Sequence, residues 1–294
     1  MNQTAKRGKL PFLKRLRRGL LLFVGLYLLI CIGGAIFQRQ LIYYPSVYTR
    51  EQVDQMVRGT GLERWTNSAG QFIGFKQPSP KQPAEGSVMV MYGNASTAIG
   101  SGDYADEIQA VAAFDVFILE YPGYEDRPGR PSQRNLFNAA DEAFQMLSTN
   151  KPIYLVGESL GTGVASYLAG TYSNKITGII LISPFDSLTD VGQSHFPLLP
   201  VRLLLVDRFP SKRYLRGYHG KVGITVDGKD SVVPEKFGLR LYHGYTGPKK
   251  LWEFPDGEHC QIMEQPSEFW RGVVEFWQTN SPRRNANGDP SAVP

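Results

Sequence analysis

The chain has 294 residues, of which 42% are hydrophobic and 20% are charged, a balance typical of a globular protein with a sizeable core. This composition excludes a disordered or repeat-built chain. The net charge of +5 comes from the first 18 residues, which hold seven lysines and arginines and no acid, so the remainder is slightly acidic. The basic balance therefore belongs to a short tail, and nucleic-acid binding is not expected.

An uncharged apolar segment follows the basic tail, from Gly19 to Phe37. At about 1.5 Å per residue it forms a helix of roughly 28 Å, close to the hydrocarbon thickness of a bilayer. We expect residues 1–38 to be a single-pass signal anchor with a cytoplasmic N-terminus, because positive charge precedes the segment. The remainder would then be periplasmic or extracytoplasmic. The alternative is a secreted protein, since the small residues at 33–35 could be a cleavage site.

Residues 39–280 alternate between apolar runs of strand length and helical patterns, after a connector at 39–50, a short helix at 51–59 and a hairpin at 63–77. The expected strands are 87–92, 114–121, 153–158, 176–182, 222–226 and 249–254, and the expected helices are 104–113, 133–147, 160–171, 234–244 and 267–279. This alternation predicts an α/β fold with a mostly parallel central sheet and helices on both faces. The longer interval at about 187–220 predicts a short cap, and the polar tail at 281–294 predicts disorder.

The pentapeptide Gly157-Glu158-Ser159-Leu160-Gly161 lies between an expected strand and an expected helix. A serine on such a sharp turn has a strained backbone, so the residues two positions away must be nearly free of side chain. The Gly-x-Ser-x-Gly spacing therefore predicts a nucleophile elbow with Ser159 as the nucleophile. The alternative is an ordinary glycine-rich turn.

A serine nucleophile needs a base, and the base needs an orienting acid. Among four histidines, His259 follows the last expected strand, where a doubly wound hydrolase places its base. For the acid we favour Asp230, with Asp227 as the alternative, because both follow the penultimate strand. Asp186 is expected to cap the next helix, and His195 is a weaker candidate for shaping a substrate entrance.

An oxyanion hole needs two backbone donors. Leu160 follows the nucleophile and supplies one, and Asn94, after the first parallel strand, is the best candidate for the other. The turn at 121–124 is expected to shape the pocket wall or to be purely structural. Metal and phosphate motifs such as H-E-x-x-H, paired C-x-x-C and G-x-x-x-x-G-K are absent from the sequence, so we expect no metal and no cofactor.

Together these segments resemble the α/β-hydrolase superfamily, in its membrane-anchored, serine-aminopeptidase-like branch. The matching pieces are 92–95, 120–124, 131–132, 157–161, 182–185, 227–234 and 255–259, which span about residues 40–280. The likeness implies Ser159 as nucleophile, Asp230 as acid and His259 as base, with Asn94 and Leu160 as oxyanion donors. Two departures stand out: Tyr92 replaces a frequent histidine, and the loop at 227–230 is one residue short.

We therefore expect a membrane-anchored serine hydrolase that cleaves a carboxylic ester, thioester or amide of a small-molecule or lipid-like acyl substrate. A peptide substrate is less expected, because the likeness is one of fold. The alternative is a non-catalytic binding or scaffold protein, against which the intact catalytic set argues. A third possibility keeps the same residues for acyl-transfer or haloperoxidase-like chemistry, which product analysis would separate from hydrolysis.

Overall fold

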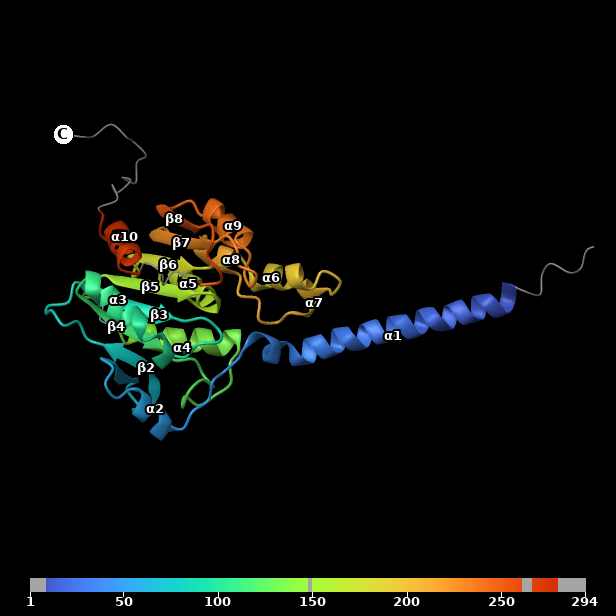
Figure 1. Cartoon of the computed structure of the whole chain (residues 1–294), viewed down its shortest axis with the longest axis horizontal. Coiled ribbons are helices and arrows are strands. Elements are labelled where there is room, and N and C mark those ends of the chain that lie inside the picture. The colour runs from blue at the N-terminus through green and yellow to red at the C-terminus, as the bar shows by residue number, and fades with distance from the viewer. Residues whose placement is uncertain (1–8, 148–149, 261–265, 280–294) are drawn as a thin grey trace, which may run out of the picture.

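A mixed sheet with strand order β1-β2-β4-β3-β5-β6-β7-β8 lies at the centre of the computed structural model, which describes residues 9–147, 150–260 and 266–279 (Figure 1). The strands are β1 (Glu63–Thr66), β2 (Phe72–Gln77), β3 (Gly86–Met91), β4 (Phe114–Leu119), β5 (Ile153–Glu158), β6 (Gly178–Ile182), β7 (Lys221–Asp227) and β8 (Lys249–Phe254). The first three in sheet order pair antiparallel, which confirms the predicted hairpin, and the others pair parallel. The tail predicted at 281–294 lies outside the described residues.

The central strands are apolar along their whole length because helices cover both faces of the sheet. Every residue of β3, β6 and β7 is buried. The covering helices on the two faces are α3 (Asp103–Val111) with α10 (Pro266–Gln278), and α4 (Gln133–Gln145) with α5 (Leu160–Thr171) and α8 (Ser211–Leu215). The smaller elements are α2 (Arg50–Met56), the 3-10 helix η1 (Ile99–Ser101) and α9 (Lys236–Gly244). This arrangement confirms the predicted α/β fold class.

A long helix, α1 (Lys9–Ile42), leads away from the sheet (Figure 1). Within the described residues, the stretch Phe12–Ile42 is the one helix long and apolar enough to cross a membrane. The helix is longer than predicted: a connector was expected to begin at residue 39, but α1 continues to Ile42. The helix continues to Ile42 because its last two turns pack on the domain, where Gln38 and Arg39 find polar partners.

The segment between β6 and α8 projects beyond the sheet and meets α1. It contains α6 (Leu188–His195) and α7 (Val201–Leu204), and we call residues 188–206 the cap. Ser187, rather than the predicted Asp186, caps α6: its Oγ accepts the N–H of Asp190 at 3.1 Å. Asp186 instead pairs with Arg240 at 2.9 Å.

Polar contacts join the end of α1 to the cap and to the residue that directly follows the cap. Gln38 donates from Nε2 to the carbonyl of Leu204 at 3.3 Å and accepts the N–H of Val206 at 2.7 Å. Directly after the cap, Asp207 accepts from Arg39 Nε at 3.1 Å and from the Tyr43 hydroxyl at 3.0 Å. Since the Asp207 side chain is buried, these contacts fix the end of α1 against the domain.

Candidate active site

Ser159 stands at the turn between β5 and α5 with a strained backbone, at φ 47° and ψ −114°. Such a conformation is rare for a residue with a side chain and is a mark of functional sites. The flanking glycines are required by close packing. A Cβ on Gly161 would lie 2.0 Å from the carbonyl oxygen of Met91, and one on Gly157 would lie 2.8 Å from that of Gly161. The turn thus has the geometry of a nucleophile elbow.

Three predicted residues from separate loops meet at this turn. His259 Nε2 lies 2.9 Å from Ser159 Oγ, and its Nδ1 lies 2.6 Å from Asp230 Oδ2. The second carboxylate oxygen of Asp230 accepts two backbone N–H groups, from Val232 at 2.8 Å and Val233 at 2.7 Å. The carboxylate is therefore fixed in place, and the contacts form a continuous path from hydroxyl to carboxylate.

Asp227, the alternative acid, lies behind the histidine loop. Its Oδ2 accepts from the hydroxyl of Ser183 at 2.6 Å, and the oxygen of that hydroxyl accepts the N–H of Cys260 at 3.1 Å. Burial raises the pKa of Asp227 above its usual value. Its contacts support the backbone next to His259.

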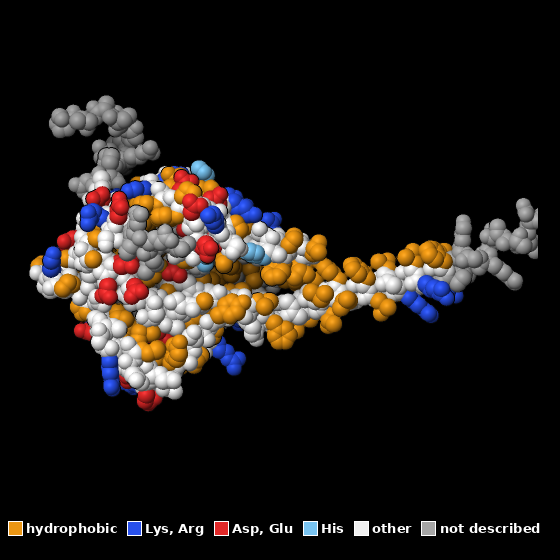
Figure 2. Space-filling view, in the orientation of Figure 1, with side chains coloured by type: hydrophobic (Ala, Val, Ile, Leu, Met, Phe, Trp, Pro, Cys, Tyr) orange, Lys and Arg blue, Asp and Glu red, His pale blue; other side chains and the backbone are white. Residues whose placement is uncertain are grey.

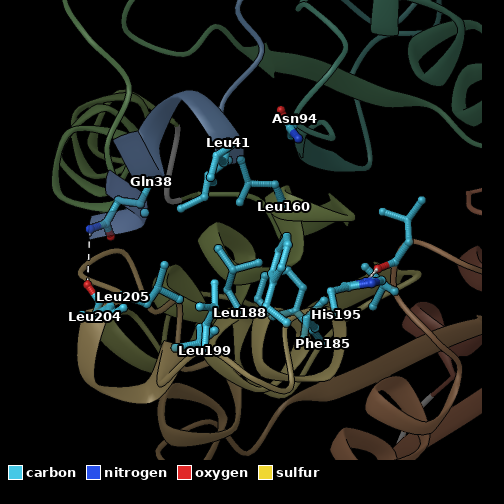
Figure 3. Close-up of a pocket in the computed structure, with 18 of the residues that line it drawn as sticks. Gln38, Leu41, Asn94, Leu160, Phe185, Leu188, His195, Leu199, Leu204 and Leu205 are labelled. Carbon is cyan, nitrogen blue, oxygen red and sulfur yellow. Dashed lines mark hydrogen bonds between the residues drawn. The ribbon is translucent and has the colours of Figure 1, made fainter. Parts of the chain in front are cut away.

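The two predicted oxyanion donors, Asn94 and Leu160, both line the cavity beside Ser159 (Figure 3). Asn94 lies in the loop that follows β3. Two tyrosines, which were expected to shape the pocket wall or simply to form a turn, hold this loop instead. Tyr124 donates to the carbonyl of Asn94 at 3.0 Å, and Tyr121 donates to the carbonyl of Tyr92 at 2.9 Å. Neither tyrosine lines the cavity. The sequence indicated only that the two tyrosines flank a turn. It did not indicate their hydrogen-bond partners, which lie about 30 residues away in sequence.

Buried acids brace the same loop. The hydroxyl of Tyr92, the residue that departs from the family pattern, donates to Glu120, whose other oxygen accepts the N–H of Ala98 at 3.0 Å. Glu158, next to the serine, is held by the hydroxyl of Tyr104. Burial raises the pKa of both carboxyl groups and so favours their protonated forms. These contacts hold the loop that carries Asn94 and the turn at Ser159 in place.

An apolar cavity of about 290 Å³ extends from Ser159 between the cap and the end of α1 (Figure 3). Its walls include Leu41 of α1, Leu160 at the elbow and the cap residues Leu188, Leu199, Leu204 and Leu205. His195 is also part of the wall, and its Nε2 lies 2.9 Å from the carbonyl oxygen of Val232. Ser159 therefore opens onto a largely apolar surface.

Metal binding finds no support in the part of the chain that the structure describes. Across residues 9–147, 150–260 and 266–279, no group of three or more histidine, cysteine, aspartate or glutamate side chains is placed to hold an ion.

Comparison with known proteins identifies the family. Residues 88–217 match the model of the alpha/beta hydrolase fold. An uncharacterized protein of Mycobacterium tuberculosis is 31% identical over 228 residues, which cover 76% of this chain and 80% of that protein. The chain belongs to the α/β-hydrolase superfamily.

Two further likenesses concern proteins with named activities. The lysophosphatidylserine lipase ABHD12 of Danio rerio is 29% identical over 186 residues, which cover 56% of this chain but only 48% of the lipase. The esterase Pf2001 of Pyrococcus furiosus shares the fold, with a TM-score of 0.57 and 15% identity over 80% of this chain and 94% of the esterase.

Proposed function

We propose that the protein is a membrane-anchored serine hydrolase of carboxylic esters or thioesters. The observation that carries this proposal is the unbroken contact path from Ser159 through His259 to Asp230, at 2.9 Å and 2.6 Å. These distances lie within the range for a nucleophile and its base. The superfamily and its esterase and lipase relatives support hydrolysis as the reaction class.

In the proposed reaction, His259 Nε2 takes the proton of the Ser159 hydroxyl while Oγ attacks the acyl carbon. Asp230 holds the Nδ1–H of the imidazole and stabilises the imidazolium that forms. The N–H groups of Leu160 and Asn94 receive the negative charge that develops on the carbonyl oxygen. The imidazolium then protonates the leaving alcohol or thiol, and a water molecule activated by His259 releases the acyl group and frees Ser159.

The cavity supports an acyl substrate with an apolar chain. Its wall is largely apolar and rich in leucine and valine side chains, which match a hydrocarbon chain better than a peptide. The lysophosphatidylserine lipase of Danio rerio supports a lipid-like ester as the substrate class. Amide cleavage is the less favoured reaction.

The apolar helix supports association with a membrane. We propose that residues 1–38 include the membrane span, with the N-terminus cytoplasmic, and that residues 39–280 form the hydrolase domain on the opposite side. The basic residues before the apolar stretch are the ground for this orientation.

A fluorophosphonate probe, which reacts with activated serines, tests the proposal on full-length protein in membranes. We expect the wild type to be labelled in the membrane fraction and Ser159→Ala to be unlabelled. Ser166→Ala is the matched control, because Ser166 is buried on the same helix and does not line the cavity. A folded wild type that takes no label would contradict the proposal and favour the non-catalytic alternative. Label in the soluble fraction would favour the cleaved, secreted form.

A further inference from the structure

The cap runs beside the part of α1 that is expected to lie in the membrane. The hydroxyl of Tyr27 donates to the carbonyl of Leu198 at 2.9 Å, and Gln38 contacts Leu204 and Val206. Tyr27 and Gln38 are separated by about 17 Å along a helix. The cap therefore accompanies α1 over roughly half of the thickness of a bilayer core.

The outer surface of the cap is apolar and exposed. Leu198 is 85% exposed, Leu203 is 81% exposed and Val206 is 65% exposed. None of these three side chains lines the cavity. Figure 2 shows hydrophobic side chains on the cap continuing into those of α1. A continuous apolar surface of this kind on a soluble face would be unusual and marks a site of interaction.

Charged residues set the limit of this surface. The uncharged stretch of α1 ends at Arg39, which pairs with Asp207 where the cap rejoins the domain. Within the cap, Arg202 pairs with Asp190 at 2.8 Å, and a long arginine side chain can reach back to a headgroup layer. The apolar part of the cap and the apolar part of α1 thus end at the same level.

We propose that the cap is embedded in the leaflet next to the domain and that the cavity receives its acyl chain directly from the hydrocarbon layer. The wall of the cavity is shared between α1, through Gly34, Gln38 and Leu41, and the cap, through Leu199 and Leu204. A chain that leaves the bilayer between these elements reaches Ser159 without crossing water. At about 290 Å³ the cavity is at the lower end of small-molecule pockets, which fits an ester with one acyl chain rather than two.

Depth measurements test the insertion without requiring catalysis, whereas the acyl-ester chemistry rests on the proposed function. Leu198→Cys and Leu203→Cys, each in the full-length protein in phosphatidylcholine vesicles, are labelled with an environment-sensitive fluorophore. Ser68→Cys, in the exposed turn between β1 and β2, is the matched control, and labelled wild type gives the background from Cys31 and Cys260. We expect bromine atoms on the lipid chains to quench the two cap probes and aqueous iodide to quench the Ser68→Cys probe. Cap probes that iodide quenches as strongly as the control would overturn the insertion.

Kinetics test the route of the substrate. We expect the double variant Leu198→Ser, Leu203→Ser to hydrolyse a long-chain ester in vesicles about tenfold more slowly, because two leucine side chains no longer favour the lipid. Its hydrolysis of a short water-soluble ester should be unchanged, as should both activities of Met146→Ser, an exposed apolar residue at the end of α4. Equal loss on both esters would overturn the route. If the wild type hydrolyses neither ester, the proposed function fails, while the depth measurement still decides the insertion.

Discussion

The hydroxyl of Ser183 donates to Oδ2 of Asp227 at 2.6 Å and accepts the backbone N–H of Cys260 at 3.1 Å. Ser183 has a positive φ of 48°, a strained conformation that persists because surrounding contacts such as these hold it. The pair therefore supports the loop that carries His259. This contact also distinguishes Asp227 from Asp230, because Asp227 bonds Ser183 whereas Asp230 bonds His259. Sequence position alone leaves either residue as the acid.

Replacing each carboxylate by its amide should distinguish them. In Asp230→Asn the one remaining oxygen is held by the N–H groups of Val232 and Val233, so an NH₂ group that cannot accept faces His259 Nδ1. We expect kcat to fall by about 10⁴-fold, because the imidazole is no longer held in the reactive tautomer. Asp227→Asn keeps an oxygen that can accept from Ser183, so we expect a loss of no more than about tenfold, within the range of one weakened hydrogen bond. Steady-state hydrolysis of a short ester measures both. A comparable loss in the two variants would contradict the assignment of Asp230 as the acid.

Tyr124→Phe should slow turnover by loosening the loop that carries Asn94, the proposed oxyanion donor. The lost hydroxyl donates to the carbonyl of Asn94, and one such bond is worth about 0.5–1.5 kcal/mol, which corresponds to a fall of roughly two- to tenfold in kcat. KM should change little, because the tyrosine does not line the cavity. Tyr167→Phe is the control, since its hydroxyl bonds Asp141 away from the cavity. A rise in KM at constant kcat would place the role of Tyr124 in substrate binding.

Gly161→Ala should fold poorly. The added Cβ would lie 2.0 Å from the carbonyl oxygen of Met91, which is backbone and cannot move aside, so we expect a loss of about 3 kcal/mol or more in the free energy of unfolding. Gly272→Ala in α10 is the matched control: its Cβ would be 3.7 Å or more from its neighbours, and alanine favours a helix by up to about 1 kcal/mol. Thermal unfolding in detergent compares the two. Equal midpoints would show that the elbow tolerates a side chain.

Glu158 should make stability depend on pH. Burial raises its pKa above the usual 4.5. The contribution of protonated Glu158 to the free energy of unfolding is therefore complete below pH 4.5 and is lost as the pH rises through the folded-state pKa. Glu158→Gln keeps an acceptor for Tyr104 but cannot ionise. We therefore expect its unfolding midpoint, relative to that of the wild type, to rise as the pH increases.

Thermal unfolding between about pH 4 and pH 9 measures this difference. Glu253→Gln is the control, because Glu253 is exposed on β8. A difference between Glu158→Gln and wild type that is the same at every pH would show that Glu158 does not titrate differently in the folded and unfolded states.

Local sequence signals predicted the elements well where apolar runs are long and continuous. The bounds of β5 and α5 agree with the prediction to the residue, because a buried run ends there in a glycine-flanked serine. The sheet order was not predictable in the same way, since β4 lies between β2 and β3 through pairings that depend on distant segments.

The site residues likewise fall into those that local sequence could predict and those that depend on distant segments. Ser159, Asp230 and His259 were predicted because each follows a strand whose carboxyl end lies at one edge of the sheet, and the structure brings them into contact. Their catalytic roles remain predictions that the variants above would test. The support from Tyr124 and Ser183 was not predictable, since a hydroxyl carries no periodic signal and its partner is set by the fold.

The contacts at the end of α1 limit where the chain can be truncated from its N-terminus. A water-soluble protein that starts after Ile42 would lack Gln38 and Leu41, and with them one side of the cavity. It would also leave the buried carboxylate of Asp207 without its arginine partner. Chain-length preferences measured on such a protein would be those of an open groove, so substrate profiling needs the complete chain in nanodiscs or detergent.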